Sequence, residues 1–220
     1  MYEQYKNYVL YALPLVVLIT NRIPFIGKFL RIINTLIHES GHALMALITQ
    51  GEVYEIELFG DRSGTTLVKT KGKFKLFLVS LSGYVVGSAF AYFMFYLISI
   101  QKYNIVFYIV IIVAMLDLAF LIRNKYGLFW VITFILILLL AYFKLNEFFQ
   151  FVFVTWISGV MLFEAFYSSV EIMIIAFKKP KLAGDAASLA KITGIPALFW
   201  AFLFVAQSAL FIYLSVRLFF

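Results

Sequence analysis

The stretch NTLIHESGHALMALITQG, residues 34–51, places three ionisable side chains, His38, Glu39 and His42, in a run that otherwise has the composition of a membrane-buried helix. The whole chain is similarly apolar: 64% of its 220 residues are hydrophobic and only 13% are charged. Soluble domains carry about 25% charged residues. The sequence therefore predicts an integral membrane protein with polar side chains in its interior.

Apolar runs of the length that crosses a bilayer recur along the whole chain. Short polar breaks separate them, and they cover residues 8–20, 25–49, 74–100, 104–122, 126–143, 148–177 and 195–218. This pattern predicts an all-α polytopic helix bundle of about six or seven spans. We expect residues 1–220 to form a single membrane-embedded domain.

The basic residues between the spans indicate an orientation. The formal net charge is +7, and counting seven spans puts most of the 18 Lys and Arg residues on the side that holds the N-terminus. Because cytoplasmic loops are rich in Lys and Arg, we expect a cytoplasmic N-terminus. Basic loops at a membrane face account for the charge, so we expect no nucleic-acid partner. A prokaryotic cell membrane is the expected location.

One segment between the spans has a different period. In EVYEIELFGDRSGTTLVKTKG, residues 52–72, apolar and acidic residues alternate, a turn follows at GDRSG, and β-branched residues resume. The pattern predicts a β-hairpin on the cytoplasmic face. Its first strand could bind an extended substrate by strand addition. The residues expected to do so are Val53, Tyr54, Glu55, Ile56, Glu57 and Leu58.

The spacing of the two histidines has a direct chemical meaning. Positions i and i+4 of a helix lie on one face, so His38 and His42 can bind the same metal ion. Glu39 can then act as the general base of a metal-dependent hydrolase. The chain contains no cysteine, so further ligands must be carboxylates. The alternative is that both imidazoles only hydrogen-bond within the bundle.

Several motifs together resemble the site-2 protease family of intramembrane zinc metallopeptidases, in particular its small, membrane-only bacterial-type branch. They are HESGHALMALITQGEVYEIEL at 38–58, SGTT at 63–66, LSGYVVG at 81–87, IRNKYG at 122–127 and GDAASLAKITGIPALFW at 184–200. The resemblance implies a Zn²⁺ cofactor, Glu39 as the catalytic residue, and His38 and His42 as metal ligands. Its substrate would be a transmembrane peptide or membrane protein, cleaved within or beside the lipid bilayer.

The third metal ligand is less clearly marked. The NxxPxxxLDG element that carries it in better-known branches is absent. The acidic candidates are Asp117, Glu164, Glu171 and Asp185. By helical rise, Glu171 lies about 9 Å and Glu164 about 20 Å from the cytoplasmic face, against roughly 10–16 Å for the histidines.

Depth therefore favours Glu171 over Glu164, whereas resemblance at GDA favours Asp185. We expect Asp185 to be the ligand, with Glu171 as an alternative ligand or a group that orients an imidazole. Asp185 could otherwise be the N-cap of a short helix that ends before Gly194.

Two other functions remain open on the sequence. The chain could be a zinc-binding membrane regulator without peptidase activity, or a transporter of metal ions or protons that uses Glu164, Glu171 and the histidines as a polar path. Glu39 argues against the first alternative, because zinc binding alone does not require it. The small residues Gly83, Gly87 and Ala91 have the spacing of a close helix contact, and we expect them to serve packing.

Overall fold

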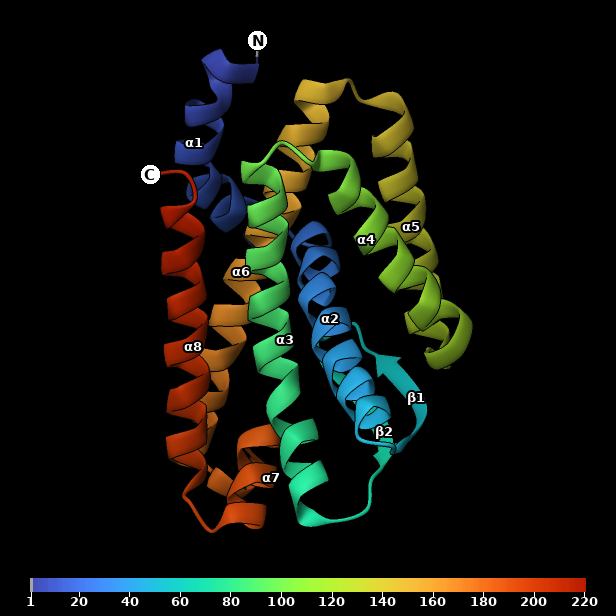
Figure 1. Ribbon diagram of the computed structural model, residues 1–220, viewed down its shortest axis with the longest axis vertical. Helices are drawn as coiled ribbons and strands as arrows, with labels where there is room; N and C mark the ends of the chain where they lie inside the picture. The colour runs from blue at the N-terminus through green and yellow to red at the C-terminus, as the bar shows by residue number, and fades with distance from the viewer. Residues whose placement is uncertain (1) are drawn as a thin grey trace.

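The computed structural model describes residues 2–220, with side chains from residue 5 onward, and consists of helices with one small hairpin (Figure 1). The hairpin strands are β1 (Glu52–Leu58) and β2 (Gly64–Lys69). The helices are α1 (Tyr2–Arg22), α2 (Ile26–Ile48), α3 (Lys73–Ser99), α4 (Tyr103–Leu116), α5 (Lys125–Lys144), α6 (Glu147–Lys178), α7 (Gly184–Thr193) and α8 (Ala197–Arg217). A π-helical turn, η1 (Asp117–Leu121), extends α4, and a 3-10 turn, η2 (Pro180–Leu182), precedes α7. This confirms the predicted all-α bundle with a hairpin after the helix that carries the histidines.

The number of membrane spans is set by the junction of α1 and α2. Within residues 5–220, five helices are long and apolar enough to cross a membrane alone: α3, α4 with η1, α5, α6 and α8. The sequence predicts one or two further spans from residues 8–20 and 25–49, the first of them a span or an interfacial helix; α1 and α2 meet the same criteria only as a pair, bent by 108°. Pro24 lies at the break, and Phe25 has a positive φ of 66°. A helix generally ends before a proline, so the bend follows from local sequence.

This junction also separates the N-terminus from the hairpin. The N-terminus lies at the end of the bundle opposite the hairpin and α7 (Figure 1). There, Tyr11 of α1 stacks on Phe220, beyond the end of α8, with ring centroids 5.0 Å apart. The sequence predicts the N-terminus and the hairpin on the same face. They lie at opposite ends, and α1 and α2 pass the length and hydropathy criteria for a span only as a bent pair.

Helix α2 runs through the middle of the bundle, against α3, α6 and the hairpin (Figure 1). Small residues make the close approach of α3 possible. A Cβ atom at Gly41 of α2 would lie 2.8 Å from the Val86 side chain, and one at Gly87 of α3 would lie 3.2 Å from the Asn34 side chain. The predicted packing role of small residues therefore applies on both helices.

The hairpin is antiparallel, with Ile56 opposite Thr66 and Leu58 opposite Gly64. The outer edge of β1 is partly covered. Ile56 forms a parallel bridge with Ile122, and the Asn124 side chain bonds both the N–H and the carbonyl of Leu58. Within the described chain β2 pairs with β1 alone, so the free edge of the sheet belongs to β2.

Candidate metal centre

Three ligand atoms from two helices meet at one point in the bundle. His38 and His42 come from α2 and Asp185 from the first turn of α7. The two Nε2 atoms lie 3.1 Å apart, and each is 3.2 Å from Oδ2 of Asp185. The structure thus brings together the three residues predicted as ligands, although they are separated by more than half of the chain.

The surrounding residues fix the orientation of both imidazoles. The Nδ1–H group of His42 donates a hydrogen bond to the Val79 carbonyl oxygen at 2.7 Å, which leaves the Nε2 lone pair free to face the other two donors. The His38 ring packs edge-on against Tyr84, with centroids 4.7 Å apart. Tyr84 in turn stacks on Phe204 of α8. Each ring is therefore held by contacts with α3.

Gly83 of α3 lies directly against the imidazoles. A Cβ atom there would come within 2.5 Å of His42 Nε2 and 2.6 Å of His38 Nε2. Such distances are too short for any side chain. Gly83 therefore has a role at the site in addition to the helix packing that its spacing predicts.

These donors fit a divalent metal ion. Zinc sites with N and O ligands at about 2.0–2.2 Å have tetrahedral edges of about 3.3 Å, close to the donor separations here. Lone pairs that face one another at this distance repel unless a cation lies between them. Three protein ligands also leave one tetrahedral position open, as in catalytic zinc sites.

The chain between α6 and α8 carries Asp185 to this point. Pro180 begins η2, Gly184 has a positive φ of 46°, and the alanines on either side of it, Ala183 and Ala186, are fully buried. The N-cap position of α7 is Ala183, and Asp185 makes no capping bond. Asp185 is thus not the N-cap considered from the sequence. Burial alone would raise the pKa of Asp185, but the adjoining imidazoles of His38 and His42 lower it below its usual value.

Glu39 faces the same cavity as the histidines. The cavity has a volume of about 630 Å³ and is also lined by residues of β2 and α7. The Thr66 hydroxyl donates to Oε2 of Glu39 at 2.6 Å. Gly64 also packs closely against Glu39, because a Cβ atom at Gly64 would lie 2.9 Å from Oε1 of Glu39. Strand β2 therefore sets the position of this carboxylate.

The other three acidic candidates have protein partners of their own. Asp117 accepts a 2.6 Å hydrogen bond from Ser40, within the HESGH motif. Glu164 accepts a hydrogen bond from Asn21 and lies 3.6 Å from the Arg31 guanidinium. Glu171 pairs with Arg62 at 2.9 Å. Within the described residues, Asp185 is the acidic group that joins the two histidines in a metal-binding arrangement.

Arg62 ties the hairpin turn to the bundle. Its guanidinium contacts Glu171, lies 3.8 Å from Glu164, and sits over the Tyr167 ring, all on α6. Its carbonyl oxygen accepts a hydrogen bond from Thr35 of α2. Partial burial would lower the pKa of Arg62, but the two glutamates raise it overall, so the group stays charged. This anchor lies two residues before Gly64.

The predicted substrate-binding strand lies outside this cavity. None of residues 53–58 lines it, whereas Ser63, Gly64, Thr65, Thr66 and Val68 do.

Comparison with protein families adds a second observation, because residues 8–215 match the family model described as Peptidase M50B-like. The chain belongs to the peptidase M50B-like family. This is a site-2 protease family, and the chain is consistent with its small, membrane-only branch.

Membership implies an integral membrane metallopeptidase in general terms, and M50 peptidases are generally zinc-dependent. Searches of curated proteins and of solved structures return no match. The site residues of this M50B-like protein that the sequence did not single out are Val79, Tyr84, Thr66 and Arg62. Tyr84 and Thr66 lie inside the LSGYVVG and SGTT motifs, which are the only sequence signals for them.

Proposed function

We propose that the protein is a zinc-dependent endopeptidase that hydrolyses a peptide bond of a membrane-embedded substrate. The observation that carries this proposal is the convergence of His38, His42 and Asp185, with Glu39 in the same cavity. A zinc ion held by the three donors would polarise the scissile carbonyl and lower the pKa of water to about 7. The family match supports the same chemistry.

Glu39 is the residue that moves protons in this scheme. Its carboxylate takes a proton from the attacking water and delivers it to the departing amine, the role of a general base and then a general acid. The Thr66 hydroxyl holds Oε2, so the other oxygen, Oε1, is the one available to water in the cavity. Glu39 is otherwise buried, which keeps its position fixed.

An extended substrate fits the free edge of β2. A peptide bond inside a helix is inaccessible until the helix unwinds, and strand addition stabilises the unwound segment through main-chain hydrogen bonds. The sequence assigns this role to residues 53–58, but the edge of β1 is already bonded at Ile56 and Leu58. Residues 64–68 lie next to Glu39 and have an unpaired edge. We therefore assign substrate pairing to β2.

The end of the bundle with the hairpin and α7 is proposed to face the cytoplasm. Basic residues gather in the segments at this end: Lys69, Lys71, Lys73, Lys75, Lys178, Lys179, Lys181 and Lys191. If α1 and α2 together cross the bilayer once, the N-terminus lies on the opposite side. Water would then reach the site from the cytoplasm.

Glu39→Gln tests the peptidase function. Purified protein in detergent or nanodiscs is assayed with fluorogenic transmembrane peptides, and zinc content is measured in the same samples. We expect the wild type to cleave and Glu39→Gln to retain zinc but lose activity by at least about 100-fold. The matched control, Glu55→Gln on β1, should behave like wild type.

Two outcomes would overturn the proposal. Cleavage by Glu39→Gln at the wild-type rate would exclude its role as base. A wild type that binds zinc stoichiometrically but leaves every membrane peptide intact would favour the zinc-binding regulator.

A further inference from the structure

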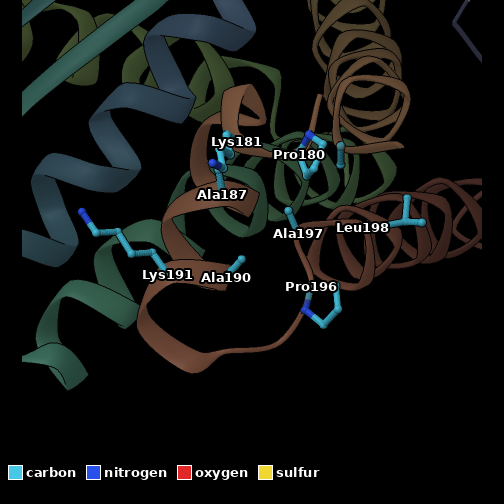
Figure 2. Close-up of a pocket in the computed structure, with 9 residues that line it drawn as sticks. Pro180, Lys181, Ala187, Ala190, Lys191, Pro196, Ala197 and Leu198 are labelled. Atoms are coloured by element: carbon cyan, nitrogen blue, oxygen red, sulfur yellow. The ribbon is translucent and has the colours of Figure 1, made fainter. Parts of the chain in front are cut away.

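A second cavity lies beside α7, on the side away from the metal centre. Its volume is about 680 Å³, within the range of small-molecule sites. It is bounded by the end of α6, by η2, by α7 and by the beginning of α8. The residues that line it are Ala176, Pro180, Lys181, Ala187, Ala190, Lys191, Pro196, Ala197 and Leu198 (Figure 2).

The cavity has a charged side and an apolar side. Lys181 and Lys191 line it from η2 and α7, with the Lys191 side chain extending outward from α7, and Pro196, Ala197 and Leu198 line it where α8 begins (Figure 2). Alanines form most of the wall between the two. A ligand that combines an anionic group with an apolar part would match these two sides.

The lysines around the cavity are not neutralised by the protein. Lys178, Lys179, Lys181 and Lys191 are all exposed, and none forms an ion pair with another described residue. The acidic residues of the segment 171–200 are Glu171 and Asp185. Both are engaged elsewhere, with Arg62 and with the histidines. The positive charge here is therefore available to an external anion.

Large apolar side chains project beside these lysines. Phe177 is 76% exposed and Leu182 is 68% exposed, and Leu198 projects from the cavity wall. Phe177 and Leu198 belong to the ends of helices that are long and apolar enough to span a membrane, a position suited to contact with lipid. Cations next to lipid-exposed apolar groups are characteristic of sites that bind the headgroup of anionic lipids.

We propose that this cavity binds an anionic glycerophospholipid. Lys181 contacts the phosphate of the headgroup, Lys191 adds a second positive charge at the rim of the cavity, and an acyl chain follows Leu198 along α8. The lysine charges account for selection of an anionic headgroup, and the apolar wall accounts for selection of a lipid over a free phosphate ion. The site is separate from the metal centre and does not depend on peptidase activity.

Native mass spectrometry of the full-length protein tests the proposal. Protein delipidated in detergent is titrated with phosphatidylglycerol or with phosphatidylcholine. We expect phosphatidylglycerol to bind more tightly, and the double variant Lys181→Gln/Lys191→Gln to weaken it about thirtyfold. The matched control, Lys102→Gln/Lys144→Gln, removes two exposed lysines at the opposite end of the bundle and should change binding less than about twofold.

A variant that fills the cavity distinguishes binding at this site from general electrostatic attraction to the protein surface. Ala190→Phe keeps every lysine but occupies the space, and it should weaken phosphatidylglycerol binding at least about tenfold. Thermal unfolding and circular dichroism identify any variant that has lost its fold. In that case Ala187→Leu takes its place, with the same expected loss.

Three results would overturn the proposal. Equal binding of the two lipids would remove the headgroup preference. Wild-type affinity in a folded cavity-filling variant would place the lipid elsewhere. Complete displacement of phosphatidylglycerol by inorganic phosphate at the same concentration would identify a free-phosphate site instead.

Discussion

Two polar clusters follow one another along the same stripe of α2, and they differ in charge balance. The donor cluster, His38, His42 and Asp185, brings three lone pairs together without a cation from the protein. The paired cluster, Arg31, Arg62, Glu164 and Glu171, holds two guanidinium groups beside two carboxylates. Thr35 and Ser63 lie between them, and Ser63 lines the cavities of both.

The difference shows which acidic residue is free to bind a metal. An acidic residue in a membrane helix is a functional candidate by default, and depth alone favours Glu171. Glu171 is already neutralised by Arg62, whereas Asp185 meets only imidazoles. An acidic residue that already has a partner of opposite charge within the protein is therefore structural, whereas one without such a partner can bind a metal.

The largest expected effect comes from a substitution that disrupts the donor cluster without altering a ligand. Gly83→Ala adds a methyl group within 2.6 Å of both Nε2 atoms, so the imidazoles must move apart. We expect zinc content near background and a loss of activity of at least about 100-fold. Gly87→Ala, one turn along α3, should keep its zinc, because its Cβ meets only the Asn34 amide oxygen at 3.2 Å. Normal zinc occupancy in Gly83→Ala would refute the close packing described here.

A smaller effect should follow from releasing Glu39. Thr66→Val removes the hydroxyl that donates to Oε2 while keeping the shape of the side chain. We expect kcat to fall about 10–100-fold with zinc content and KM unchanged. Thr65→Val on the same strand is the control, since Thr65 does not bond Glu39. A fall in zinc content instead of kcat would show that Thr66 acts on the metal ligands.

The smallest effect belongs to the paired cluster, where stability and not zinc content should change. Arg62→Glu and Glu171→Arg each place like charges together, whereas the double exchange restores an ion pair. Both side chains are partly exposed, so we expect a coupling energy of only about 0.5–1 kcal/mol in the free energy of unfolding. A double-mutant cycle in denaturing detergent measures it. Loss of zinc in either single variant would show that Glu171 acts at the metal centre.

The sequence predicts those parts of the molecule that depend on local patterns. Apolar runs mark the long helices, alternation marks the hairpin, and the spacing of His38 and His42 places both on one face of α2. Asp185 is different, because only resemblance at GDA distinguishes it from Glu171. Its position depends on η2 and α7 folding back under α3, a long-range contact that no local period encodes.

Two parts of the molecule depend on more than the local pattern of the sequence. The sequence predicts six or seven spans, and the bend at Pro24 joins α1 and α2 as one candidate pair, with the N-terminus at the end of the bundle opposite the hairpin. Residues 53–58 alternate as a free strand would, yet Ile122 and Asn124 cover part of that edge. The bend follows from Pro24, whereas the residues that cover the edge of β1 are distant from it in sequence.

Zinc content in matched carboxylate variants tests the central claim most directly. Asp185→Asn and Glu171→Gln each remove one negative charge and change little in volume. After exposure to a chelator and re-addition of zinc, we expect Glu171→Gln to bind about one ion per chain, as the wild type does, and Asp185→Asn to bind at least about tenfold more weakly. Full zinc retention in Asp185→Asn together with loss in Glu171→Gln would contradict the assignment of the donor cluster.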